Sequence, residues 1–488
     1  MASIYRFLAV LIVAAGLASC APHDVEQCGT SAPIYPDYTD ITVPVNIAPL
    51  NFLVREDGVS AVRLTADGAL IASSCSEEVR FGIGKWKRFL EENCGKTIDL
   101  GLFVKKSGKW LEYNHFTWTV SPDKVDSYLT YRVIEPDYEA YNNLVLQQRC
   151  VENFDTYDFS DHAVVGNKCM NCHVYAGCDP NNSMFYVRGK GGGAILNRGG
   201  ELHKLAIKGE GMVSGSVYYG FSPSKRYIVF STNKIIPSYH SYAKNRMEVF
   251  DTVSDVYVAD LDDHKFISSP LLKDSTVMET FPAFGADGKH IYYCSAPQQD
   301  TINLEILKGV KYSLCRVEFD ESSGVIGSVV DTVYNARTEG HSVCHPRVSP
   351  DGRFVCFSIA DFGTFPLWHS ESDLVMIDLR DGHLVEMPLA NSDRSDTYHS
   401  WSSNSRWLVF ASKRDDGVYG KPYFTHVDEN GVSTKAFVLP QKNPHFYDNF
   451  LKSYNAPESG TGPLPFSVFD VKEALSLESE TFTYAEGL

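Results

Sequence analysis

The sequence predicts a mainly β protein whose C-terminal half is a β-propeller of five to seven blades. A tight-turn motif, each time followed by an apolar run, recurs at intervals of about 60 residues, and a repeat of about four strands is the pattern of a propeller blade. Aromatic residues, mostly Tyr and Phe, make up 12% of the 488 residues, which favours strands. Four copies of the turn are explicit: Phe221–Arg226, Phe284–Lys289, Val348–Arg353 and Trp401–Arg406.

The predicted propeller covers residues 181–455, and a C-terminal tail follows at residues 456–488. Each turn motif leads into a strand and then into a second hairpin, as a blade requires. A further blade is expected at Met184–Leu205, with a tight hairpin at Arg188–Gly193. That hairpin is not a phosphate-binding loop, because it lacks the Lys and Ser or Thr of the P-loop pattern.

Residues 37–136 predict a separate, β-sandwich-like N-terminal domain. Short extended runs alternate there with turn signals such as Asp-Gly. One amphipathic helix is expected at Gly84–Asn93, where Trp86, Phe89 and Leu90 fall on one face. We expect this domain to serve packing or recognition.

Between the two domains, residues 137–180 are predicted to form a helical linker with a loop that carries the most informative motif of the chain. Cys169, Cys172 and His173 have the spacing C-x-x-C-H, the pattern of covalent c-type haem attachment. The two thiols add to the two vinyl groups of haem, and the histidine is placed as the proximal iron ligand. The alternatives are a disulfide-type loop or half of a zinc site, although a second C-x-x-C is absent nearby.

A haem iron needs a second axial ligand or an open position. The candidates for a distal ligand are His399, His345 and His240. His399 and His345 lie two and three residues before their turn motifs, a position that leads into the innermost strand of a blade, and His240 shares a Tyr-His-Ser sequence with His399. The simpler interpretation of each is a hydrogen-bonded loop histidine. Arg188 or Lys190 could pair with a haem propionate.

The N-terminus predicts an exported, lipid-anchored protein. Residues 1–19 have a basic residue and a short apolar run, too short for a membrane span. The residues before Cys20 resemble a bacterial lipobox, which implies a lipoprotein signal peptide, cleavage before Cys20 and lipidation of its thiol. Residues 20–36 are expected to be a polar tether. Covalent haem attachment also takes place outside the bacterial cytoplasm, so both signals agree.

The turn motifs resemble the WD-like blades of the TolB family of periplasmic propellers, in which an aromatic residue, Ser-Pro-Asp-Gly and a basic residue precede a strand. Val348–Arg353 matches this pattern closely and the other three copies are degenerate. The combination with a lipobox and C-x-x-C-H resembles envelope lipoproteins of Bacteroides-type bacteria, which implies a periplasmic or surface position on the outer membrane. A G-x-S-x-G nucleophile elbow is absent from the sequence, so a prolyl-oligopeptidase-type enzyme is not expected.

These features predict an electron-transfer or haem-based redox-sensing protein of the cell envelope, with covalent haem c as cofactor and an envelope protein or redox partner. Two alternatives stay open: a non-enzymatic propeller scaffold that binds envelope proteins or glycans, and a haem peroxidase-like enzyme. The formal net charge of −17 argues against nucleic acid as a partner.

Of the twelve cysteines, nine remain after lipid and haem are assigned, so an odd number is left in an oxidising compartment. Cys75 and Cys94 are candidates for a disulfide. Cys294 and Cys356 lie in apolar strand patterns and are expected to be buried, unpaired residues.

Overall fold

The computed structural model describes residues 22, 24–136, 143–239, 247–300 and 303–485. The predicted signal peptide (residues 1–19), the lipidation site Cys20 and the candidate ligand His240 lie outside the described residues. The chain divides into two compact units. Unit 1 comprises Met1–Lys124 and Pro440–Phe450, and unit 2 comprises Val125–Leu439 and Leu451–Leu488.

Unit 1 is mainly β, as predicted, with a seven-stranded and a three-stranded sheet among its described residues. The larger sheet contains β1 (Val25–Gln27), β3 (Ile41–Pro44), β5 (Val59–Ala66), β6 (Ala69–Ser74), β8 (Thr97–Lys106), β9 (Lys109–Glu112) and β10 (Phe116–Ser121). The smaller sheet contains β2 (Ile34–Tyr35), β4 (Phe52–Val54) and β7 (Glu78–Val79). The prediction of residues 20–36 as a plain tether is therefore wrong for β1 and β2, which pair with β9 and β4.

The predicted amphipathic helix of unit 1 is confirmed as α2 (Ile83–Glu92). It buries Trp86 and Leu90, one turn apart on the same face. The indole nitrogen of Trp86 donates a hydrogen bond of 2.9 Å to the Ile47 carbonyl, so the ring is buried without losing its polar partner. A one-turn helix, α5 (Phe446–Asn449), also belongs to this unit. None of the described helices is long and apolar enough to cross a membrane.

The described part of unit 2 forms six antiparallel sheets, which confirms the mainly β prediction. From the innermost strand outward they are β14 (Met170–Ala176), β15 (Asp179–Val187), β16 (Gly193–Arg198) and β17 (Glu201–Ala206); β18 (Ser216–Phe221), β19 (Tyr227–Tyr239), β20 (Met247–Asp260) and β21 (Lys265–Ile267); β22 (Val277–Phe284), β23 (His290–Pro297), β24 (Ser313–Asp320) and β25 (Val325–Tyr334); β26 (Ser342–Val348), β27 (Phe354–Ala360), β28 (Asp373–Asp378) and β29 (Leu384–Glu386); β30 (Asp396–Trp401), β31 (Trp407–Ser412), β32 (Lys421–His426) and β33 (Phe437–Val438); and β34 (Ser453–Gly460), β11 (Tyr128–Ile134), β12 (Val145–Cys150) and β13 (Thr156–Asp161).

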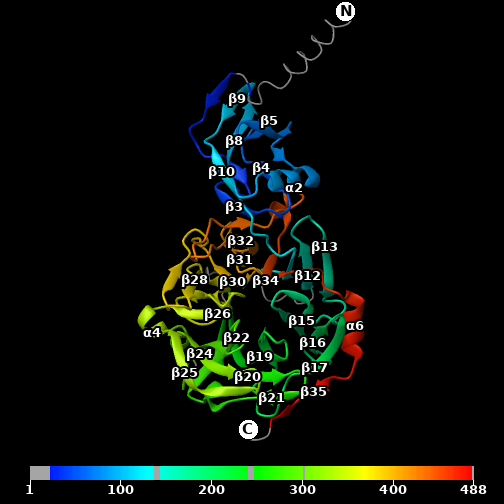
Figure 1. Ribbon diagram of the computed structural model, residues 1–488, viewed down its shortest axis with the longest axis vertical. Helices are drawn as coiled ribbons and strands as arrows, with labels where there is room; N and C mark the ends of the chain where they lie inside the picture. The colour runs from blue at the N-terminus through cyan, green and yellow to red at the C-terminus, as the bar shows by residue number, and fades with distance from the viewer. Residues whose placement is uncertain (1–21, 23, 137–142, 240–246, 301–302, 486–488) are drawn as a thin grey trace, which may run out of the picture. The chain divides into compact units, whose positions relative to one another are not determined.

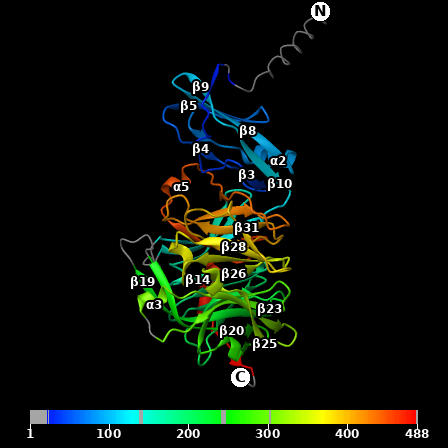
Figure 2. The same cartoon turned by 90° about the vertical axis from the view of Figure 1, so that its left-hand side faces the viewer.

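The six sheets form a closed ring, a propeller-like arrangement (Figure 1). Each innermost strand contacts the innermost strand of the next sheet, from β14 through β18, β22, β26 and β30 to β34, and β34 contacts β14 again. Figure 2 shows the long hairpin of β19 and β20, in green, at the side of the ring. The remaining short helices of unit 2 are η2 (Pro270–Leu272), α3 (Leu304–Leu307), α4 (Ala336–Glu339), η3 (Pro366–Trp368) and α6 (Val468–Ser476).

The ring is closed by a sheet that combines both ends of unit 2. The antiparallel pair β11 and β34 joins residues more than 300 positions apart in the sequence, such as Arg132 and Asn455. Two predictions were wrong here. The described part of the predicted helical linker at residues 137–180 contains β12, β13 and β14 instead, and β12 pairs with both β11 and β13. The ring also extends beyond residues 181–455 in both directions.

The turn motif works through local hydrogen bonds. In the copy before β27, the Ser349 hydroxyl accepts a bond of 2.9 Å from the Phe354 amide, and Asp351 accepts one of 3.1 Å from the Arg353 amide. Gly352 has a φ of 73°, which glycine adopts without steric cost. Because these bonds involve neighbouring residues only, the motif was recognisable from the sequence.

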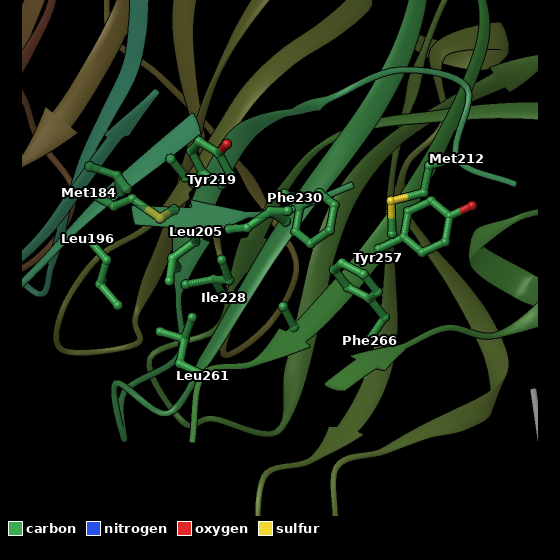
Figure 3. Packing of buried hydrophobic residues seen from close by; sticks show 14 residues of the cluster. Met184, Leu196, Leu205, Met212, Tyr219, Ile228, Phe230, Tyr257, Leu261 and Phe266 are labelled. Atoms are coloured by element: carbon green, nitrogen blue, oxygen red, sulfur yellow. The ribbon is translucent and has the colours of Figure 1, made fainter. Parts of the chain in front are cut away.

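Apolar layers fill the space between adjacent sheets. Figure 3 shows the layer between the β14–β17 sheet and the β18–β21 sheet, where Ile228 and Phe230 lie near Leu205 and Tyr257 lies farther along the layer. All four side chains are almost completely buried. The C-terminal tail adds to the outer edges of these same sheets, since β35 (Glu480–Thr481) pairs with β17 and β36 (Thr483–Tyr484) pairs with β21.

Removal of a buried aromatic ring from the closing strand should destabilise unit 2. Tyr454 of β34 is 3% exposed, and its ring meets that of Tyr131 at 4.6 Å between centroids. We expect Tyr454→Ala to lower the free energy of unfolding in urea by about 3 kcal/mol or more. Leu451→Ala is the control, since Leu451 is 61% exposed. Equal stability of the two variants would contradict closure by β34.

Candidate functional site

All six innermost strands carry a β-bulge at the same level. In β26, Cys344 pairs with Ser358 and Arg347 with Cys356, so two residues face one across the ladder. The equivalent bulged pairs are Cys172–His173, Tyr218–Tyr219, Phe281–Pro282, His345–Pro346, Tyr398–His399 and Ala456–Pro457. Bulges re-aim side chains and are common beside functional sites.

In five of the six bulges, the first residue has a left-handed backbone. The φ values are 56° for Tyr218, 50° for Phe281, 52° for His345, 51° for Tyr398 and 48° for Ala456. Such a conformation costs of order 1 kcal/mol or more for a residue other than glycine. Its repetition around the ring shows that the fold imposes it.

Four of these side chains form a continuous aromatic row across successive sheets. The ring centroids are 4.0 Å apart for Tyr218 and Phe281, 4.1 Å for Phe281 and His345, and 4.2 Å for His345 and Tyr398. The side chain at the bulge of β34 is much smaller, because Ala456 stands there. The row therefore fills one part of the channel and leaves another part open.

A cavity of about 310 Å³ opens inside the ring. It is lined by Asn171 and His173 of β14 and by Cys169, the residue before this strand. The other lining residues are Arg132, Ile134, Glu135, Leu144, Arg188, Tyr218, Tyr219, Ile235, Pro237, Tyr239, Met247, Val249, His345, Arg347, Phe365, Leu367, Tyr398, Asn455 and Ala456. The lining combines aromatic and apolar side chains with three arginines and one carboxylate, Glu135, which suits a partly apolar ligand that carries negative charge.

The C-x-x-C-H motif lies on β14, an innermost strand, rather than on a loop of a helical linker as predicted. Cys169 and His173 line the cavity, and the side chain of Met170 points elsewhere. Met170 is fully buried in an apolar cluster, and its sulfur accepts a hydrogen bond of 2.9 Å from the Ser160 hydroxyl. Met170 thus anchors the strand and is not available as an iron ligand.

Two arginines hold the motif strand. Arg132 donates to the Met170 carbonyl at 3.2 Å and to the Asn455 amide oxygen at 2.7 Å. The main-chain amide of Arg188 donates to the Cys169 carbonyl at 2.9 Å. Its guanidinium donates to the Asn171 amide oxygen at 2.8 Å, in the amide orientation that satisfies both groups.

His173 is a neutral imidazole with a free lone pair. Its Nε2 atom is buried and without a hydrogen-bond partner among the described residues. Burial, and after it the charge of Arg132, lowers the pKa of His173 to about 4. Main-chain hydrogen bonds to Ala456 and Thr130 raise the pKa, but by less than burial lowers it. A neutral imidazole is the form that binds a metal.

Of the three candidate distal histidines, His345 and His399 lie within the described residues, and their surroundings differ. His345 lines the cavity and is 4% exposed, and neither of its ring nitrogens has a hydrogen-bond partner within the described chain. Burial, followed by the charge of Arg347, lowers the pKa of His345 well below its ordinary value. His399 does not line the cavity, contrary to the prediction, and its neighbour in the bulge, Tyr398, lines it instead. Its Nε2 atom is bonded to the Cys356 carbonyl at 2.9 Å.

Sequence reasoning missed Arg132, Arg347, Tyr218 and Tyr398. A signal for the bulge residues exists, since a bulky residue stands three positions before each of the four turn motifs. The arginines could not be found in this way. Arg132 reaches the site only because β11 pairs with β34.

A buried ionic cluster fixes part of the cavity wall. His369 is fully buried, and its two ring nitrogens lie 2.9 Å from Glu248 and 2.6 Å from Glu371. Glu248 stands on β20 between Met247 and Val249, which line the cavity. Burial alone would lower the pKa of His369, and the two carboxylates overcome this and raise it to about 9. The cluster therefore joins β20 to the segment after η3.

Four other cysteines and one acidic turn of the described chain were candidates for further sites or bonds. Cys75 and Cys94 are exposed and unbonded, so the predicted disulfide is wrong. Cys294 and Cys356 are buried, free thiols, as predicted. Asp378, Asp381 and His383 form a group that could hold an ion. The carboxylate of Asp378 is already paired with Arg353 at 3.3 Å and with Arg380 at 2.8 Å.

No protein-family model matches this chain, and no curated protein matches it. Among solved structures, prolyl oligopeptidase B from Galerina marginata is similar at 12% identity and a TM-score of 0.36, over 70% of this chain and 42% of that one. A puromycin-hydrolysing peptidase of Mycobacterium tuberculosis has 12% identity and a TM-score of 0.36, over 71% and 52%. An oligogalacturonate lyase in complex with manganese has the same identity and score, over 64% and 74%. This chain thus spans about half or less of the two peptidases.

The His369 cluster predicts a loss of stability at alkaline pH. Because the pKa of His369 is raised from 6.5 to about 9 on folding, its contribution is complete below about pH 6.5 and is lost as the pH rises through about 9. We expect His369→Gln to lower the free energy of unfolding by about 3 kcal/mol at pH 6 and by much less at pH 10. Urea unfolding at both pH values measures this.

His383→Gln is the matched control, since the side chain of His383 is 54% exposed. This variant should follow the wild-type pH profile. A His369→Gln variant with the same deficit at pH 6 and pH 10 would show that the imidazolium charge does not stabilise the cluster.

Proposed function

We propose that unit 2 is a c-type cytochrome with a propeller, in which one haem is held covalently in the channel for electron transfer or redox sensing. The observation that carries the proposal is the position of the motif. Cys169 and His173 of the C-x-x-C-H sequence both open on the cavity, and His173 presents a buried nitrogen without a partner among the described residues. The other five innermost strands have the same bulge but no C-x-x-C-H sequence.

The residues around the cavity fit a haem. Cys169 and Cys172 would hold the porphyrin, and His173 would bind the iron as the proximal ligand. Arg132, Arg188 and Arg347 line the cavity and would face the propionates. When bound, the haem supplies one-electron chemistry.

The protein contributes a fixed and largely dry environment for that chemistry. Asn455 lines the cavity, and its buried amide nitrogen has no partner within the described chain, so it could donate to a carboxylate. Tyr218 and Tyr398 border the same space and would cover an aromatic macrocycle. Burial, ligand type and hydrogen bonds are the means by which a protein sets a haem potential.

The finer assignment is also part of this proposal. We place the blades with the TolB-like, WD-like repeats, because the Ser-Pro-Asp-Gly turn of Val348–Arg353 makes the hydrogen bonds that such a turn requires. We place the protein in the cell envelope with a lipid anchor at Cys20, on the strength of the sequence before that residue. An electron carrier must exchange electrons with another protein, so we also propose a redox partner in the cell envelope.

A scaffold without haem is the alternative that one observation favours. The bulge at Cys172–His173 recurs in the five other innermost strands, so the backbone there has a structural cause of its own. In that case the channel residues would serve the packing of the ring, and binding of envelope proteins or glycans would be the function.

Covalent haem should depend on the two motif thiols. We expect wild-type protein, expressed with a cytochrome c maturation system, to retain haem after denaturation, and Cys169→Ala/Cys172→Ala to lose it completely. A haem stain and a pyridine haemochrome spectrum measure this. Cys75→Ala/Cys94→Ala is the matched control, because it removes two exposed thiols of unit 1 and should keep the haem. Wild-type protein without covalent haem would refute the proposal in favour of the scaffold.

A further inference from the structure

We propose that His345 is the second axial ligand of the haem iron, so that a single haem joins two opposite sheets of the ring. This inference rests on the proposed function and goes beyond it. It names the group that completes the iron coordination, and it assigns the site to electron transfer rather than to an enzyme with an open iron position.

The topology places His345 opposite the haem motif. The innermost strands follow one another around the ring in the order β14, β18, β22, β26, β30 and β34 (Figure 1). Strand β26 is therefore the third from β14 in either direction. His345 begins the bulge of β26, and Cys172–His173 form the equivalent bulge of β14. His173 is the second residue of its bulge and His345 is the first residue of its own, and both line the cavity from sheets on opposite sides of the ring.

Both histidines reach the same space. His173 and His345 line a single cavity of about 310 Å³. A haem in that cavity would have both imidazoles among the side chains around it. A six-coordinate haem requires an axial ligand on each face.

The ring nitrogens of His345 lack polar partners among the described residues although the side chain is only 4% exposed. A buried donor or acceptor without a partner is destabilising, and such exceptions in folded proteins call for an explanation. An iron bond would supply a partner for one of the two nitrogens. A phenylalanine or a leucine at this position would leave no buried polar atom without a partner, but the chain has a histidine there.

The His345 side chain is also held firmly in place. Its ring lies between Phe281 at 4.1 Å and Tyr398 at 4.2 Å, measured between centroids. The left-handed backbone of the residue, with a φ of 52°, fixes the direction in which the side chain leaves the strand. A ligand that is positioned before the metal arrives loses little freedom on binding.

The other candidates within the described chain do not line the cavity, although the Nδ1 atom of His399 also lacks a partner there. The Nε2 atom of His399 is bonded to the Cys356 carbonyl, and His399 does not line the cavity. Met170 and Met184 are buried in apolar clusters between sheets. His345 is the remaining described candidate that faces the motif.

The test is the coordination state of haem-loaded protein. Wild-type protein, His345→Ala and the control His399→Ala are first compared for covalent haem by pyridine haemochrome, and then for spin state by electronic absorption and electron paramagnetic resonance. We expect wild type and His399→Ala to be six-coordinate and low-spin and to bind no carbon monoxide when reduced. His345→Ala should become high-spin and bind carbon monoxide, and added imidazole should restore the low-spin spectrum.

His345→Met provides a second measurement in case the alanine variant does not fold. A methionine ligand raises the reduction potential of a haem relative to histidine, so we expect a higher potential with the haem content unchanged. Haem-loaded wild type that is high-spin, or a His345→Ala variant that stays low-spin, would overturn the ligand assignment and leave the proposed function intact. Wild type without covalent haem would overturn both.

Discussion

The channel of unit 2 depends on one backbone constraint, the left-handed bulge in the middle of the innermost strands. A non-glycine residue held at a φ near 50° is strained, yet Tyr218, Phe281, His345, Tyr398 and Ala456 all adopt this conformation. The strain is tolerated because each strand is paired on both sides of the bulge and packed against its neighbours in the ring. The result is a set of side chains directed toward the same axis from different sheets.

The identity of those side chains then decides where the channel is open. The row from Tyr218 to Tyr398 fills the positions of four successive sheets with rings about 4 Å apart. Ala456 at the bulge of β34 leaves room beside the motif strand, and it lines the cavity together with Cys169 and His173. The cavity thus follows from a difference in side-chain size around a repeated backbone. The positively charged lining contrasts with the formal net charge of −17 of the whole chain.

The repeated turns and most strands could be predicted because their determinants are local. The turn of Val348–Arg353 is held by bonds between residues at most five positions apart, and the helix at α2 shows its apolar face directly in the sequence. The sixth sheet could not be predicted, since β11 and β34 become partners only when the ring closes. The apolar residues before the motif fit both a helix and a strand, and tertiary pairing decided for a strand.

The candidate site divides in the same way. The motif residues Cys169, Cys172 and His173 were identified from spacing alone, and His345 was one of three histidines that the blade pattern suggested. The choice among the three required the structure, because it depends on which residue of a bulge faces the cavity. The assignment of Arg132 to the site required the long-range pairing of β11 with β34.

The central claim is that the channel strand carries a covalently bound haem, and mass spectrometry of the protein matured for c-type haem tests it most directly. The account predicts an intact mass equal to that of the polypeptide plus one haem, and a proteolytic peptide containing Cys169–His173 that bears the added mass. An intact mass equal to that of the polypeptide alone, with unmodified thiols at both motif cysteines, would contradict the account.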